Sequence, residues 1–236
     1  MNVSDSHRHY TPAQRKRMKA QVLQALARLR DRFPLQARIE TAPEPVRAEY
    51  GRILRQWRDG ESPPQAARCD PELLEALVNL DAVVVQGEGL GCYPFSAEAT
   101  TFVVRGTEGE TKVHAFCAFD ALAIPRLLGR HCRIESACAS CGRGRYFEVH
   151  GNGGLSEQAV HDTVVVWAQD HGAGSPAGSC RSLCPNIRFL CSSCGGWSRN
   201  TVLTLAQATA VANAFFAFQL RLAGADGSVA IEGAGS

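Results

Sequence analysis

A cysteine and an aspartate stand three residues apart in the apolar segment 116–122, as Cys117 and Asp120. If Cys117 opens a helix, the helix dipole lowers the pKa of its thiol, and Asp120 shares its face. Burial would raise the pKa of Asp120 and keep its carboxyl protonated at neutral pH. The pair predicts nucleophilic attack coupled to proton delivery. The alternative is a buried structural cysteine beside a capping aspartate.

Another thiol pair, Cys180 and Cys184, has three intervening residues and is followed by Pro185. The preceding stretch is rich in Gly, Ser and Pro, which predicts a loop that leads into a strand. Loop thiols are more available to ligands than core thiols. The alternative is one incidental and one buried cysteine.

Two CxxC-Gly patterns form the third chemical feature, and they contain Cys138, Cys141, Cys191 and Cys194. Each pattern is typical of a zinc knuckle, and together they would supply four thiolates to a tetrahedral structural zinc site. The spacing between the pairs is longer than in a compact zinc ribbon. Separate redox or reactive thiols, and plain core cysteines, are the two alternatives.

Composition describes an ordinary globular protein: 236 residues, 45% hydrophobic and 20% charged. Because no eighteen-residue apolar run and no secretory signal occur, we expect no membrane span and a cytoplasmic location. Ten cysteines in a reducing compartment favour metal or thiolate chemistry over disulfides. No GxGxxG, P-loop, GxSxG or HExxH pattern supports a nucleotide cofactor or serine-type hydrolysis.

Charge is unevenly distributed, since residues 1–60 carry 13 Lys and Arg against 6 Asp and Glu. A basic N-terminal region is compatible with nucleic-acid binding. We favour a solvated helix face whose arginine stems cover apolar surface.

The hydrophobic pattern predicts an α+β protein. Helices are expected over 11–33, 44–58 and 70–80, followed by a hairpin of strands 82–85 and 101–104. Three helices and a hairpin are the order of a winged helix. Further elements are predicted as a helix over 117–128, strands near 131–136, 145–149, 162–168 and 186–190, and a helix over 203–222.

The segment 114–125, HAFCAFDALAIP, resembles the Cys-Ala-Leu-Asp segment of the alkylmercury (organomercurial) lyase family. Weaker pieces follow in the family's order and include Tyr93–Ser96, Gly129–Arg130, Ser136–Cys138, Cys184–Leu190 and Trp197.

The resemblance implies a winged-helix-like three-helix domain packed on a mixed or antiparallel sheet core with flanking helices. We expect that first domain over residues 1–110, an α+β catalytic domain over 111–223 and a mobile tail over 224–236.

The resemblance also implies an activity, the protonolysis of a carbon–mercury bond to a hydrocarbon and Hg(II). By position, Cys117 and Cys184 correspond to the family's catalytic cysteines and mercury ligands, and Asp120 to its catalytic aspartate. The residue chemistry agrees, because thiolates are the soft ligands that a soft metal prefers. The expected partners are a small organomercurial and a small thiol or thiol-bearing acceptor for Hg(II). No organic cofactor is expected.

Two features depart from the family pattern: Pro185 stands where some members have another cysteine, and the two CxxC pairs are additional. They leave two competing hypotheses. One is a lyase-like enzyme that uses the same Cys and Asp pair on another substrate. The other is a zinc-containing regulatory protein whose basic winged helix binds DNA.

Overall fold

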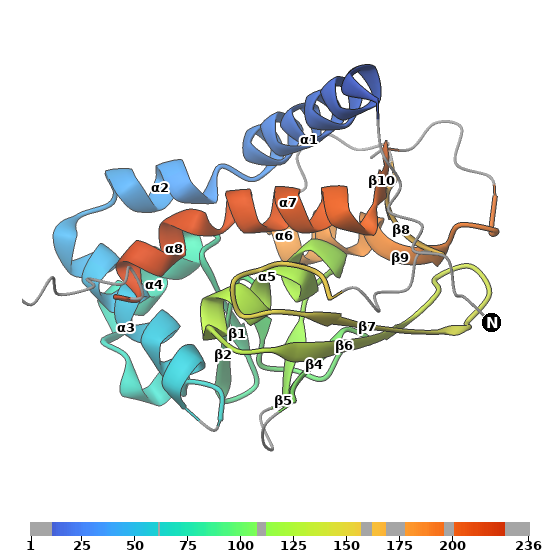
Figure 1. Cartoon of the computed structure of the whole chain (residues 1–236). Helices are drawn as coiled ribbons and strands as arrows, with labels where there is room; N and C mark the ends of the chain where they lie inside the picture. The colour runs from blue at the N-terminus through green and yellow to red at the C-terminus, as the bar shows by residue number, and fades with distance from the viewer. Residues whose placement is uncertain are drawn as a thin grey trace, which may run out of the picture.

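The protein has an α+β fold, as the sequence predicts (Figure 1). The computed structural model describes residues 11–60, 62–107, 112–156, 162–168, 178–195 and 201–224. The helices are α1 (Pro12–Arg32), α2 (Leu35–Thr41), α3 (Glu44–Asp59), α4 (Pro71–Asn79), α5 (Ala118–Leu128), α6 (Ser179–Ser182), α7 (Leu205–Phe215) and α8 (Ala217–Leu222), with 3-10 turns η1 (Ala66–Arg68) and η2 (Cys184–Asn186). The strands are β1 (Val83–Gln86), β2 (Gly89–Cys92), β3 (Phe95–Ser96), β4 (Val103–Gly106), β5 (Lys112–Ala115), β6 (Cys132–Ala137), β7 (Gly144–Val149), β8 (Thr163–Trp167), β9 (Ile187–Cys191) and β10 (Thr201–Thr204).

Two antiparallel sheets organise the described part of the chain. The larger sheet has the order β1-β2-β3-β5-β4-β6-β7, and the smaller has the order β10-β8-β9. The β6–β7 hairpin forms one edge of the larger sheet, and β9 forms one edge of the smaller sheet. These two edges lie next to each other. The backbone N–H of Ala139, which follows β6, donates a hydrogen bond to the carbonyl oxygen of Phe189 in β9 at 3.0 Å.

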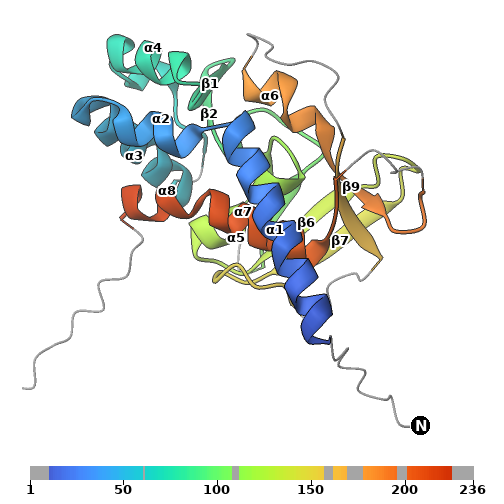
Figure 2. The same ribbon diagram turned by 90° about the horizontal axis from the view of Figure 1, so that it is seen from above.

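Helix α5 is the centre of the fold. Every residue of this helix except Arg126 is buried, which is typical of a helix covered on all sides. It contacts β4, β5 and β6 of the larger sheet, β9 of the smaller sheet, and α7. Helix α1 lies across α7 on the outside, as the view from above shows (Figure 2). The start of α5 is therefore deep inside the protein.

Local signals in the sequence correctly predict several helix ends. Thr11 caps α1 and forms a capping box with Gln14, and Pro12 occupies the first turn. The Asp70 carboxylate accepts hydrogen bonds from two backbone N–H groups of α4. Gly129 ends α5 with a φ of +63°, a conformation that glycine adopts without strain.

The predicted hairpin between strands 82–85 and 101–104 is wrong. Strand β1 pairs with β2, so that Val83 is opposite Cys92. Strand β4 pairs with β5 and β6, and three strands separate it from β1. The short turn at residues 87–88 allows an immediate hairpin, which costs less chain entropy than a longer connection.

The structure corrects one helix prediction and adds one helix. The helix predicted over 203–222 is divided into α7 and α8, and helix α2 is additional to the predicted elements. Residues 201–204 form β10, and Thr204 then caps α7 in a capping box with Gln207.

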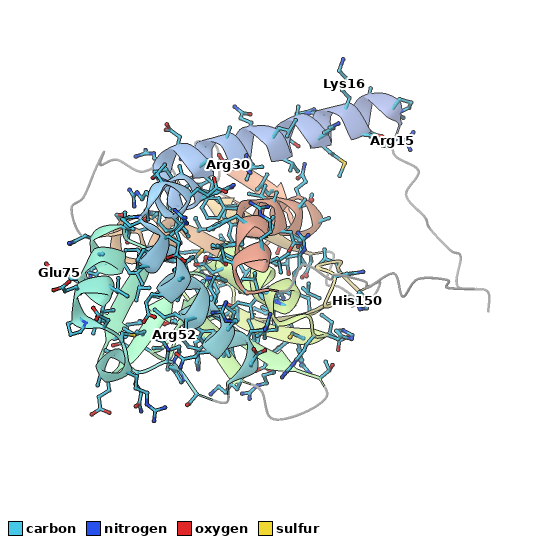
Figure 3. The ribbon with its side chains drawn as sticks, turned by 90° about the vertical axis from the view of Figure 1, so that its left-hand side faces the viewer. Arg15, Lys16, Arg30, Arg52, Glu75 and His150 are labelled. Atoms are coloured by element: carbon cyan, nitrogen blue, oxygen red, sulfur yellow. The ribbon has the colours of Figure 1, made fainter. Side chains whose placement is uncertain are left out.

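The basic side chains of α1 are exposed except for Arg28, which is half-buried over the Trp167 ring and donates a hydrogen bond to the Thr201 hydroxyl at 2.8 Å. This agrees with a solvated helix face whose arginine stems cover apolar surface. Arg15 and Lys16 project from the N-terminal part of the helix and Arg30 lies near its other end (Figure 3). Nucleic-acid binding and the division into domains at residue 110 stay predictions. No helix in the described ranges combines the length and apolarity that a bilayer crossing requires. Trp197 lies outside the described residues, and so does the predicted tail after Gly224.

Candidate active site

Cys117 and Asp120 are positioned by the start of α5. Strand β5 ends at Ala115, and Cys117 is the N-cap residue of the helix, with extended backbone angles of φ −153° and ψ −179°. Asp120 is the third helical residue. These are the two positions that face each other in a capping box, so the local fold brings a thiol and a carboxyl together.

Cys184 reaches the same point from a distant part of the sequence. It begins η2, directly before β9. Its Sγ lies 3.7 Å from Oδ2 of Asp120, within hydrogen-bonding reach of a thiol. The ligand atoms of Cys117, Asp120 and Cys184 all lie within 4.8 Å of one another. The structure thus gathers the three residues that the sequence singled out for catalysis.

All three side chains are buried. Their exposed fractions are 2% for Cys117, 4% for Asp120 and 5% for Cys184. Burial raises the pKa of the Asp120 carboxyl to about 7, in the expected direction, so that both its protonated and its ionised form are populated at neutral pH. Asp120 therefore exchanges its proton near neutral pH.

The expected lowering of the Cys117 pKa is wrong. Burial raises the pKa of this thiol, and a hydrogen bond with Cys184 opposes the increase. Removal of the thiolate from water destabilises it more than the helix dipole stabilises it, so the pKa of the thiol rises. Cys117 consequently needs a base to take its proton, and the neighbouring Asp120 is such a base whenever it is ionised.

Asp81 anchors the segment that carries Cys184, and sequence reasoning missed it. Oδ2 of Asp81 accepts hydrogen bonds from the Ser179 backbone N–H at 2.9 Å and the Ser179 hydroxyl at 2.7 Å. Oδ1 of Asp81 accepts one from the Tyr93 hydroxyl at 3.3 Å, and Arg38 approaches the carboxylate at 3.6 Å.

No sequence signal connects Asp81 to Ser179, because 98 residues separate them. Asp81 has a φ of +53°, a conformation that aspartate tolerates better than most side chains. The positive φ shows that the chain turns sharply at Asp81, but it does not indicate which residue the Asp81 side chain binds.

A cavity of about 350 Å³ opens at Cys184. Its lining combines the aromatic rings of Phe102, Phe116 and Phe189 with polar groups that include Arg188. Cys117 and Asp120 are not among the described lining residues and lie deeper in the protein. A small molecule with an apolar group would therefore meet Cys184 first.

The four cysteines of the CxxC patterns form a second thiol cluster. The ligand atoms of Cys138, Cys141, Cys191 and Cys194 lie within 4.8 Å of one another. Cys138 also lines the cavity that opens at Cys184. The side chain of Cys180 lies outside the description.

His114 does not join either thiol cluster among the described residues. Its Nδ1 accepts a hydrogen bond from the Thr100 backbone N–H at 3.0 Å, and burial lowers the pKa of its ring. This agrees with a hydrogen-bonded strand histidine.

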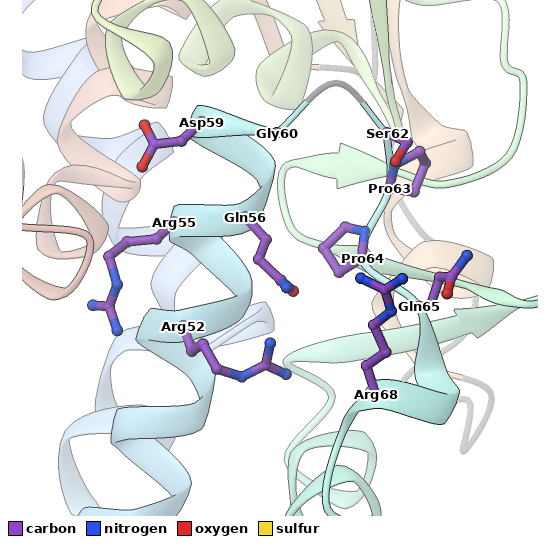
Figure 4. A pocket seen from close by; sticks show the side chains of 10 residues that line it. All are labelled: Arg52, Arg55, Gln56, Asp59, Gly60, Ser62, Pro63, Pro64, Gln65 and Arg68. Carbon is purple, nitrogen blue, oxygen red and sulfur yellow. The ribbon is translucent and has the colours of Figure 1, made fainter.

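A separate cavity of about 470 Å³ lies between α3 and the segment around Pro63 and Pro64 (Figure 4). Arg52, Arg55 and Arg68 line it, and its described lining contains no cysteine or histidine. Arg52 is already paired with Glu49 at 2.6 Å. This cavity does not share the chemistry of the thiol clusters.

Comparisons with known proteins identify the fold and the family. A solved structure described as the mercury-bound form of MerB2 superposes with a TM-score of 0.60 at 18% identity, over 78% of this chain and 96% of that chain. This is a likeness of fold. No curated protein matches the sequence. The sequence model of the alkylmercury lyase family matches residues 95–217. Because the match spans more than half of the 236 residues, the protein belongs to the alkylmercury lyase family.

Proposed function

We propose that Cys117, Asp120 and Cys184 cleave the carbon–mercury bond of a small organomercurial by protonolysis. The observation that carries this proposal is the buried group of two thiols and one acid, with ligand atoms within 4.8 Å of one another. Two soft sulfur ligands suit mercury, and the acid beside them suits proton transfer to carbon.

Capture of the substrate begins at Cys184, because this thiol lines the cavity. The Cys184 sulfur bonds to mercury, and the leaving ligand on mercury departs with the thiol proton. The apolar walls around Phe102 and Phe189 take up the organic group. A cavity of about 350 Å³ is large enough for a small alkyl or aryl group.

Proton transfer then passes through Asp120. The ionised carboxylate takes the proton of the Cys117 thiol, and the Cys117 sulfur becomes the second bond to mercury. Asp120 delivers this proton to the carbon atom, and the electron pair of the carbon–mercury bond forms the new carbon–hydrogen bond. The products are a hydrocarbon and Hg(II) held by two sulfurs, and Asp120 returns to its ionised form.

A carboxyl with a pKa of about 7 suits this role, since it both accepts and donates a proton near neutral pH. The reaction uses no organic cofactor. Release of Hg(II) requires a competing ligand, so we propose transfer to a small thiol or to a thiol-bearing protein in the cytoplasm.

Replacing either catalytic thiol should abolish turnover. We expect Cys117→Ser and Cys184→Ser to reduce hydrocarbon release from a phenylmercury salt with excess small thiol to background, because a hydroxyl is a hard and poor mercury ligand. The matched control is Cys69→Ser, which removes a thiol outside both clusters and should retain activity. Turnover by folded Cys117→Ser would contradict the mechanism.

The acid should be separable from mercury binding. Asp120→Asn removes the proton shuttle and keeps both sulfurs, so we expect kcat to fall by about 10²–10⁴-fold. Binding of one Hg(II) per chain, measured by equilibrium dialysis, should remain. Equal losses of binding and turnover would contradict a proton-transfer role.

Asp120 should also make stability depend on pH. Burial raises its pKa from about 3.9 in the unfolded chain to about 7 in the fold, so the free energy of unfolding falls as pH rises between these values. Asp120→Asn lacks this loss. In urea unfolding, we expect its stability relative to the unsubstituted protein to improve by about 2–3 kcal/mol from pH 5 to pH 8. A constant difference would mean that Asp120 ionises as easily as in water.

Asp81 should act as a positioning residue. Asp81→Ala removes the acceptor of the Ser179 hydrogen bonds and loosens the segment before Cys184, so we expect kcat/KM to fall by up to about 10²-fold. Asp81→Asn keeps a side-chain oxygen and should lose much less. Circular dichroism verifies folding of both variants. Unchanged kcat/KM in folded Asp81→Ala would remove Asp81 from the mechanism.

A further inference from the structure

The second thiol cluster lies where the two sheets meet. Cys138 and Cys141 belong to the turn between β6 and β7, at the edge of the larger sheet. Cys191 ends β9 of the smaller sheet, and Cys194 follows in the next turn. The protonolysis mechanism uses none of these four thiols.

The sulfur separations fit a tetrahedral metal site. Sγ of Cys138 and Sγ of Cys194 are 3.8 Å apart, and those of Cys141 and Cys191 are 3.7 Å apart. Four sulfurs at the zinc–sulfur bond length of about 2.3 Å define a tetrahedron with edges of about 3.8 Å. A disulfide requires about 2.05 Å. The thiols therefore stand at the spacing of metal ligands.

The backbone around the cluster supports the same geometry. Gly142 follows the first pair with a φ of +72°, and its N–H donates to the Cys138 carbonyl at 2.9 Å. The N–H of Cys191 donates to Sγ of Cys138 at 3.3 Å. Hydrogen bonds from backbone N–H groups to sulfur orient a thiolate ligand and stabilise its charge. Gly142 thus allows the tight turn that brings two sulfurs to one side.

The cluster is buried on one side and open to solvent on the other, since Cys138 and Cys191 are buried, Cys194 is half-buried and Cys141 is exposed. Cys138 and Cys191 are 2% and 0% exposed, and the guanidinium of Arg145 interacts electrostatically with both. Arg145 is itself buried and is held by Asp162 at 2.8 Å. A nearby cation offsets part of the negative charge that four thiolates bring to a divalent metal.

We propose that Cys138, Cys141, Cys191 and Cys194 bind one Zn(II) ion, which fastens the β6–β7 turn to the end of β9. Four protein ligands leave no open position on the metal, so the ion is structural.

Zinc at this position would also shape the active-site cavity. Cys138 and its neighbours Ala137 and Ala139 line this cavity together with Phe189 and Cys184. The ion would therefore fix one wall against the strand that follows Cys184. Zinc ligation would also keep these four sulfurs from competing with Cys117 and Cys184 for mercury. This consequence for catalysis rests on the proposed function; the zinc site does not.

Metal analysis tests the site directly. The full chain, purified under reducing conditions after zinc-supplemented expression, should contain one zinc per chain. Cys141→Ser should lose most of this zinc, while Cys69→Ser, which removes a thiol outside the cluster, should retain it. Folded, unsubstituted protein without zinc, or with iron or mercury in these four thiols, would overturn the proposal.

Thiol protection gives a second readout that needs no variant. Cys141 is exposed and should be alkylated first in a metal-free protein. With zinc bound, we expect a thiol reagent to modify Cys141 only after a chelator is added, as peptide mass mapping can show. Substitution by Co(II) should give the absorption spectrum of a tetrahedral tetrathiolate. Rapid alkylation of Cys141 in zinc-loaded protein would contradict the site.

Both readouts are independent of turnover. Cys117→Ser should keep its zinc, so loss of lyase activity in that variant leaves the metal site intact. An inactive protein that binds zinc would refute only the proposed function, and an active protein without zinc would refute only the metal site.

Discussion

Burial of Asp120 between two thiols is the constraint on which the site depends. In water this carboxyl would be ionised at neutral pH and too weak a base to take a proton from a thiol beside it. Enclosure by α5, α7 and the sheets brings its pKa to about 7. The same enclosure raises the pKa of Cys117, so thiol and acid depend on each other for proton exchange.

Such a site requires a rigid surrounding, because the two sulfurs come from segments that are not neighbours in the chain. Cys117 is fixed by the buried start of α5. Cys184 is fixed by a short turn, which Asp81 holds through Ser179. The proposed zinc ion would hold the other end of the same strand at Cys191. Position, more than thiol reactivity, then determines which sulfurs meet the substrate.

Local signals predicted most elements but not their pairing. Thr11 and Asp70 mark helix starts through their own side-chain hydrogen bonds, so their sequence neighbours suffice. Strand β4 could have paired with β1, β5 or β6 on pattern alone. Its partners are β5 and β6, a choice made by packing across the whole sheet. Helix α2 gave too short a signal for prediction.

The sequence by itself determined the chemistry: soft thiols in two CxxC pairs, and Cys117 three residues before Asp120. It also placed Cys117 at the start of a helix, because that depends on local spacing. The family resemblance assigned Cys184 to the same site, and the tertiary structure brings its sulfur to this pair. Only the tertiary structure decided that Asp81 anchors the segment before Cys184 and that burial makes the Cys117 thiol less acidic. The physical reason is that pKa values and long-range contacts depend on what surrounds a side chain in space, which its sequence neighbours do not specify.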